Sequence, residues 1–177
     1  SKLTKLPHSL YPKLKSQVST GNNLKTKLLI SVSNNRESGR LKNETTASII
    51  NTLSKEFQFD IYISTLNSDY DIAANLQKKI IQHSIINQTP LLKDFIKLMN
   101  VMDICLLSEG GSMHMAAALG VPQVVLFGFT SSITWAPLSN TATLLNDKSN
   151  VNNIPTKQIL EALKTKLQNI EASRFKN

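Results

Sequence analysis

Short apolar runs alternate with longer amphipathic segments along most of this chain. A brief apolar run that ends in a polar loop predicts a strand. Such runs cover residues 27–33, 60–65, 81–86, 104–107, 123–127 and 141–145. Apolar residues that recur at spacings of three and four predict a helix. These segments cover about residues 44–57, 72–80, 91–102, 112–119 and 160–170. The alternation predicts an α/β, Rossmann-like fold in which a parallel sheet carries helices on both faces.

The first part of the chain differs from the rest. Residues 1–26 are polar, contain two prolines and a glycine, and lack periodicity, so we interpret them as a linker or interdomain arm. Residues 27–177 form the predicted domain, and a chain of 177 residues can bury a core of ordinary size. Ligands of parallel α/β sheets bind at the carboxyl ends of the strands. The loops expected to carry function are therefore 33–43, 64–70, 108–113 and 128–140.

A pair of glycines follows the predicted strand that ends at Leu107. Gly110 and Gly111 allow a sharp turn and close approach of a ligand, and a helix begins near Ser112. The first amides of a helix lack internal partners and favour a phosphate, helped by the helix dipole. The alternative is a plain glycine turn capped by Ser112. The two glycines alone leave both interpretations open.

Two ionisable residues flank this turn. Glu109 would repel a phosphate, so its better use at a ligand site is to accept hydrogen bonds from sugar hydroxyls. Alternatively, its charge stabilises the start of the helix. His114 lies in the first turns of the predicted helix, where it is either a satisfied helix histidine or a ligand contact.

Charge and composition narrow the possible partners and compartments. The net charge of +8 favours an anionic partner, but the basic residues are dispersed, so we expect no nucleic-acid binding. The single cysteine, Cys105, lies in an apolar run and is expected to be a buried structural thiol. The start of the chain lacks a signal-peptide core and no apolar run reaches the ~20 residues of a membrane span, so we expect a cytoplasmic protein. The three histidines are scattered, and no metal or cofactor is expected.

One continuous motif carries a specific resemblance. Residues 109–128 read EGGSMHMAAALGVPQVVLFG, and WAP follows at residues 135–137. This pattern resembles glycosyltransferase family 9, the ADP-heptose lipopolysaccharide heptosyltransferases. It departs from the family in having Glu109 in place of an aspartate and Gly110 in place of a threonine or serine. The resemblance implies the C-terminal, nucleotide-sugar-binding half of a GT-B glycosyltransferase, without the N-terminal acceptor-binding domain.

The resemblance also implies a reaction. The enzyme would transfer a sugar to the phosphorylated inner core of lipopolysaccharide with inversion, at the cytoplasmic face of the inner membrane and in peripheral contact with it. The donor would be ADP-heptose or another nucleotide-diphosphate sugar. The acidic group thought to act as catalytic base belongs to the other domain, so residues 1–177 alone are expected to be inactive and to contain no catalytic residue. Two rival functions are a free-standing, non-enzymatic nucleotide-binding module and, less favoured, a basic nucleic-acid-binding domain.

Candidate site residues follow from the loops and the resemblance together. Donor phosphates are assigned to Arg40 first, then Lys42 and Arg36, together with Gly110, Gly111 and Ser112. The donor sugar is assigned to Glu109 and His114. The nucleotide cleft is assigned to Ser33, Gly128, Thr130 and Trp135. Two alternatives remain: the basic loop could be merely exposed, and Trp135 could fill the core rather than form a wall of the cleft.

Overall fold

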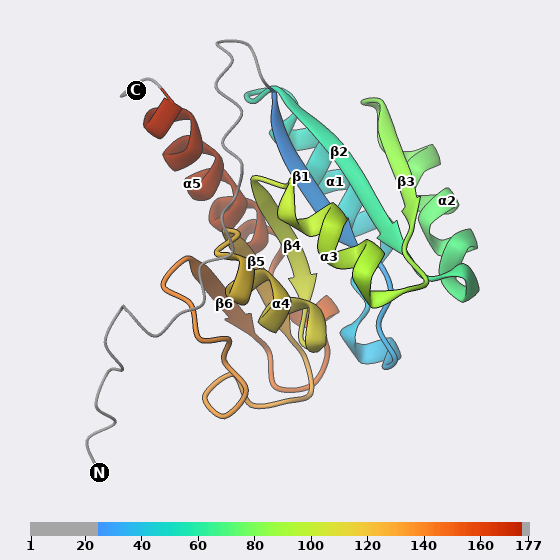
Figure 1. Ribbon diagram of the computed structural model, residues 1–177, viewed down its shortest axis with the longest axis vertical. Coiled ribbons are helices and arrows are strands. Elements are labelled where there is room, and N and C mark those ends of the chain that lie inside the picture. Colours follow the sequence, from blue (N-terminus) through green and yellow to red (C-terminus); the bar gives the residue numbers. More distant parts are fainter. Residues whose placement is uncertain (1–24, 175–177) are drawn as a thin grey trace.

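A six-stranded, fully parallel sheet forms the centre of the molecule, with the strand order β3-β2-β1-β4-β5-β6 (Figure 1). The computed structural model describes residues 25–174, so the predicted linker lies almost wholly outside the described residues. The strands are β1 (Thr26–Ser31), β2 (Phe59–Thr65), β3 (Ser84–Gln88), β4 (Ile104–Ser108), β5 (Gln123–Phe127) and β6 (Ala142–Asn146). This is the order of a doubly wound Rossmann-like sheet, which confirms the predicted fold class.

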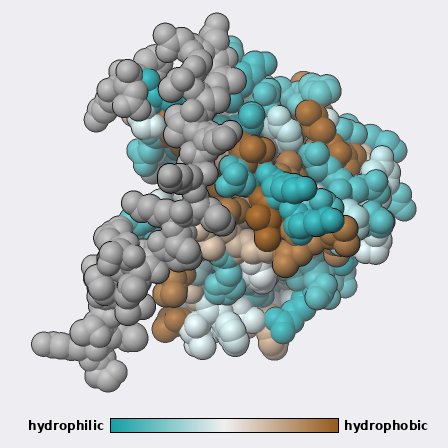
Figure 2. Space-filling model, viewed as in Figure 1, coloured by the Kyte–Doolittle hydropathy of each residue, from teal (hydrophilic) through white to brown (hydrophobic). Residues whose placement is uncertain are grey.

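Helices cover both faces of this sheet. They are α1 (Asn43–Leu53), α2 (Tyr70–Lys79), α3 (Leu92–Asn100), α4 (Gly111–Leu119) and α5 (Thr156–Arg174). Helices α1, α2 and α5 pack on one face, while α3 and α4 pack on the other (Figure 1). The surface on the α3 and α4 side mixes hydrophilic areas with exposed apolar side chains (Figure 2).

The central strands are buried on both faces, which explains their continuous apolar runs. Leu28 and Leu106 face the core under α1 and α5, whereas Leu29 and Cys105 face the core under α3 and α4. Cys105 is fully buried, as predicted, and burial raises the pKa of its thiol. Successive residues of a strand therefore face opposite cores, as the pleat of the sheet requires.

Some predicted boundaries are wrong, each for a local reason. The helix predicted over residues 44–57 ends at Leu53, and a turn then carries Phe57 back into the core. The strand predicted over residues 81–86 is Ser84–Gln88, because Ser84 is the first residue that pairs with β2. Ile81, which suggested the earlier start, is 87% exposed. Three 3-10 turns were not predicted: η2 (Glu37–Gly39), η3 (Asn67–Asp69) and η4 (Val151–Asn153).

The strand order places a switch point between β1 and β4. From β1 the sheet extends through β2 to β3, and from β4 it extends through β5 to β6. The chain therefore leaves these two neighbouring strands toward opposite sides, and a crevice opens between their following loops. The loop after β1 and the glycine turn after β4 form this part of the carboxyl edge (Figure 1).

Candidate functional site

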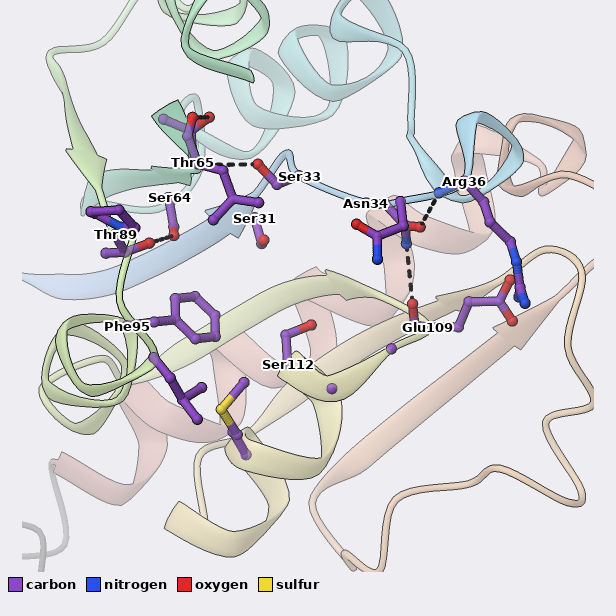
Figure 3. Close-up of a pocket in the computed structure, with 17 residues that line it drawn as sticks. Ser31, Ser33, Asn34, Arg36, Ser64, Thr65, Thr89, Phe95, Glu109 and Ser112 are labelled. Atoms are coloured by element: carbon purple, nitrogen blue, oxygen red, sulfur yellow. Dashed lines mark hydrogen bonds between the residues drawn. The ribbon is translucent and has the colours of Figure 1, made fainter. Parts of the chain in front are cut away.

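A pocket of about 540 Å³ lies at the carboxyl ends of four neighbouring strands. Its walls come from the loops after β1, β2, β3 and β4 and from the start of α3 and α4 (Figure 3). The volume lies within the range of small-molecule sites in proteins. The pocket includes the switch point between β1 and β4, where the fold is expected to bind a ligand.

The glycine turn after β4 forms the floor of this pocket. Gly110 has φ 144° and ψ −169°, a conformation that favours glycine strongly. A Cβ atom built on Gly110 or Gly111 would meet nothing within 4 Å, so the space in front of the turn is open. Gly110 has no side chain to cap α4, and Ser112 lines the pocket beside it. The first amides of α4 are therefore accessible to an anion.

Asn34 connects the loop after β1 to this turn. Its amide nitrogen donates to the Glu109 carbonyl at 3.1 Å, and its Oδ1 accepts from the Arg36 amide at 2.9 Å (Figure 3). Arg40 Nε donates to the Asn34 carbonyl at 2.7 Å. The prediction did not include Asn34, although its position directly after an apolar strand was a signal. These bonds hold the two loops of the switch point together.

The structure separates the three predicted phosphate-binding cations. Arg36 lines the pocket, but Arg40 and Lys42 line a different groove beside α1 and α2. Arg40 also pairs with Asp69 at 3.3 Å and is absent from the lining of the pocket that contains the glycine turn. The geometry therefore does not support the preference for Arg40 over Arg36. The 3-10 turn η2 lies between the two arginines and changes the direction of the chain.

Glu109 is buried and its carboxylate faces the loop after β5. The residue is 6% exposed, and its oxygens accept from the Phe129 amide at 2.9 Å and the Thr130 amide at 2.8 Å. The Thr130 hydroxyl also donates to it. Burial alone would raise the pKa of Glu109, but the hydrogen bonds from Thr130 and Phe129 outweigh burial and lower it. The carboxylate is thus an anion with three donors, and its assignment to a donor sugar stays a prediction.

Of the remaining predicted residues, some line the pocket and others do not. Ser33 lines it, and its hydroxyl accepts from the Leu66 amide at 3.0 Å. His114 is exposed on α4 and does not line the pocket. Trp135 is 57% exposed, so the interpretation that it fills the core is wrong. Gly128 is buried where a Cβ would come within 2.8 Å of the Ser38 carbonyl oxygen, which makes it a packing residue.

The opposite end of the pocket consists of residues that the prediction did not name. The hydroxyls of Ser64 and Thr89 are 2.9 Å apart and buried, and Thr65 lies beside them (Figure 3). Apolar atoms of Leu92 and Phe95 line the same end. The signal for Ser64 and Thr65 was the polar end of the apolar run at 60–65, which falls in one of the loops expected to carry function. Thr89, Leu92 and Phe95 lie outside all of those loops.

Two kinds of feature are absent from residues 25–174. Within this range no three His, Cys, Asp or Glu side chains gather closely enough to share a metal ion. No helix in the same range combines the length and apolar character that crossing a membrane requires. The expectation that donor binding needs no metal stays a prediction.

Solved structures share this fold. They include the Escherichia coli ADP-heptose lipopolysaccharide heptosyltransferase II, at 18% identity and a TM-score of 0.72 over 83% of this chain and 48% of that one. A family 9 glycosyltransferase from Veillonella parvula matches at 16% identity and a TM-score of 0.74, over 82% of this chain and 46% of that one. The E. coli heptosyltransferase WaaC, solved with ADP, matches at 11% identity and a TM-score of 0.71, over 80% of this chain and 44% of that one.

These similarities show which fold the chain adopts and how much of each solved structure it covers. The chain spans about half the length of each of these structures. Its sheet is one Rossmann-like half of a GT-B glycosyltransferase fold. A comparison with curated protein sequences gives no match. The profile of glycosyltransferase family 9 (heptosyltransferase) matches residues 14–166, and the chain belongs to this family.

Proposed function

We propose that the pocket binds the nucleotide-diphosphate-sugar donor of a glycosyltransferase, and that the donor is ADP-heptose. The observation that carries this proposal is the open glycine turn at the start of α4, where unpaired amides face an accessible cavity. Such a helix start binds phosphate through its amides and its dipole. Arg36 lines the same pocket and supplies a cation for the diphosphate.

The pocket has two ends of different chemistry, which orients the donor. The diphosphate lies at the end formed by Gly110, Gly111 and Arg36, with Ser112 beside it. The nucleoside lies at the opposite end, where Leu92 and Phe95 offer apolar surface to a base and Thr65 and Thr89 offer hydroxyls to polar groups. The sugar then extends from the diphosphate toward the loop after β5.

The wider reaction follows from the family and the partial length of the chain. The acceptor is the inner core of lipopolysaccharide at the cytoplasmic face of the inner membrane, and the transfer inverts the anomeric centre. In this reaction the turn stabilises the charge of the leaving diphosphate. An acceptor hydroxyl and a base must lie within a few ångströms of the anomeric carbon, and a second domain supplies both. Residues 1–177 alone are accordingly expected to transfer no sugar.

The proposal is tested by ligand-dependent thermal unfolding. ADP and ADP-heptose should raise the thermal midpoint of the chain, because a ligand selective for the folded state stabilises it by about 2.7 kcal/mol at a concentration of 100 Kd. Adenosine should do so less, since it lacks the diphosphate. No shift with any nucleotide diphosphate would contradict the proposal.

A matched pair of variants localises the site. Gly111→Val adds a side chain in the open space before the turn, where the diphosphate would lie. Ala118→Val places the same valine side chain at an exposed position of the same helix. Gly111→Val should abolish the ADP-dependent shift and Ala118→Val should retain it. Equal shifts in both variants would place the nucleotide elsewhere.

A further inference from the structure

A closed ring of contacts joins three loops at the Arg36 end of the pocket. Asn34 bonds both the Arg36 amide and the Glu109 carbonyl. The Glu109 carboxylate accepts from the Phe129 amide, and the Phe129 ring lies 5.2 Å from the Arg36 guanidinium carbon. The ring therefore runs from the loop after β1 through the loops after β4 and β5 and back to Arg36.

The Glu109 carboxylate is the only buried charge in this ring of four residues. It is 6% exposed, whereas the side chains of Arg36 and Phe129 lie at the surface. Hydrogen bonds to an ionised acceptor are stronger than bonds between neutral groups. Two backbone amides and the Thr130 hydroxyl converge on it, and removing the acceptor would leave these donors unsatisfied. The conformation at Phe129 and Thr130 thus depends on the carboxylate.

Arg36 in turn depends on Phe129. Phe129 is 66% exposed, and the Arg36 guanidinium lies over its ring. A cation over an aromatic face is attracted to the ring and loses freedom to rotate away from it. A shift of the Phe129 backbone would therefore move the ring that supports Arg36 at the rim of the pocket.

We propose that Glu109 is a positioning residue: its carboxylate fixes the turn at Phe129 and Thr130, and through Phe129 it holds Arg36 toward the pocket. It contributes to the donor site indirectly, by positioning Arg36 for the diphosphate. The carboxylate is not the group that binds the sugar. The part that concerns the diphosphate rests on the proposed function, while the part that concerns the turn does not.

The first experiment measures the turn without any ligand. Glu109→Gln keeps the shape of the side chain but replaces one acceptor oxygen by a donor. The Phe129 and Thr130 amides bond different oxygens, so one of them loses its acceptor and the pair can no longer be satisfied together. Hydrogen exchange at these two amides should become about tenfold faster or more, since a lost bond of about 1.4 kcal/mol corresponds to that factor. Emission and quenching of Trp135, the one tryptophan of the sequence, should change with it. Unchanged exchange would overturn the proposal.

Two further variants control this measurement. Glu161→Gln makes the same substitution at an exposed position of α5 and should leave the exchange of both amides unchanged. Thr130→Val removes only the hydroxyl donor and should give an intermediate increase in exchange. If Glu109→Gln does not fold, the Thr130→Val result decides: unchanged exchange at Phe129 and Thr130 would then overturn the proposal.

The second experiment separates positioning from direct sugar contact. If Glu109 acts through Arg36, Glu109→Gln should weaken binding of ADP, which has no sugar beyond its ribose, by roughly twofold to fivefold. The same substitution in an Arg36→Ala background should cause no further loss. Unchanged ADP binding with weakened ADP-heptose binding would instead assign Glu109 to the sugar and overturn the proposal. If wild type binds no nucleotide, the proposed function fails, and the exchange measurement alone still decides the role of Glu109 at the turn.

Discussion

The guanidinium carbon of Arg36 lies 5.2 Å from the centre of the Phe129 ring, across the gap between the loops after β1 and β5. This contact keeps a cation at the rim of a pocket whose floor is the glycine turn. Arg40, four residues later, points to a different groove and pairs with Asp69. Two arginines of one loop therefore lie in different surroundings: Arg36 lines the pocket and Arg40 forms an ion pair within the fold.

Different roles are expected of the two arginines, and these can be measured. Arg36→Ala should weaken binding of ADP more than binding of adenosine, because only ADP has the diphosphate. Arg40→Ala should lower the free energy of unfolding, since it removes the bonds to Asp69 and to the Asn34 carbonyl. Calorimetric titration and chemical denaturation distinguish the two effects. Lys157→Ala, at an exposed position of α5, serves as the control for loss of one positive charge. A larger loss of ADP affinity in Arg40→Ala than in Arg36→Ala would reverse this assignment.

Gly128 is expected to tolerate no side chain. A Cβ there would come within 2.8 Å of the Ser38 carbonyl oxygen and 3.0 Å of the Val151 nitrogen, both of them backbone atoms. Gly128→Ala should therefore lower the free energy of unfolding by about 1–3 kcal/mol, the usual cost of overpacking. Gly111→Ala is the matched control, because its Cβ would meet nothing within 4 Å. Equal stability of the two variants in chemical denaturation would refute the packing argument.

The parts of the fold predicted well are those decided by burial. Residues 104–107 and 123–127 were continuous apolar runs because β4 and β5 are covered on both faces. The edge strand β3 was misplaced, since it contains Ser84, Asn87 and Gln88 and has no strand on its outer side to demand apolar residues. Pattern alone does not distinguish its start from the exposed Ile81.

The candidate site could be predicted where it depends on backbone conformation. It could be predicted less well where it depends on which partner a side chain contacts. Two glycines after a strand predicted the turn, because few other residues adopt φ 144°. Which cation of the loop after β1 lines the pocket depends on η2 and on the hydrogen bonds of Asn34. One of these bonds connects Asn34 to Glu109, far away in the sequence. The hydrogen bond that the Phe129 amide donates to the Glu109 carboxylate spans 20 positions and leaves no periodic signal.

Cys105 should be unreactive in the folded protein. Its side chain is fully buried in the core under α3 and α4, and burial raises the pKa of the thiol, so little thiolate forms. An aromatic disulfide reagent should label it only after unfolding in concentrated guanidinium chloride. Rapid labelling under native conditions would indicate that β4 opens readily. The rate with ADP present should be no faster than without it, because binding stabilises the folded state.

Glu109 should make stability depend on pH in one direction. Its hydrogen bonds lower the native-state pKa below the usual value of 4.5 despite the opposing effect of burial, so the native state binds this proton more weakly than the unfolded state. The stabilisation is therefore complete above 4.5 and is lost as the pH falls through the lower native pKa. The carboxylates of Glu44 and Asp147 also have pKa values lowered by hydrogen bonds of their own, and these contribute equally to wild type and to Glu109→Gln. The free energy of unfolding, measured by chemical denaturation along a pH series, should fall more steeply below 4.5 in wild type than in Glu109→Gln. Parallel curves would mean that the carboxylate at position 109 contributes no more to the folded state than a neutral amide does.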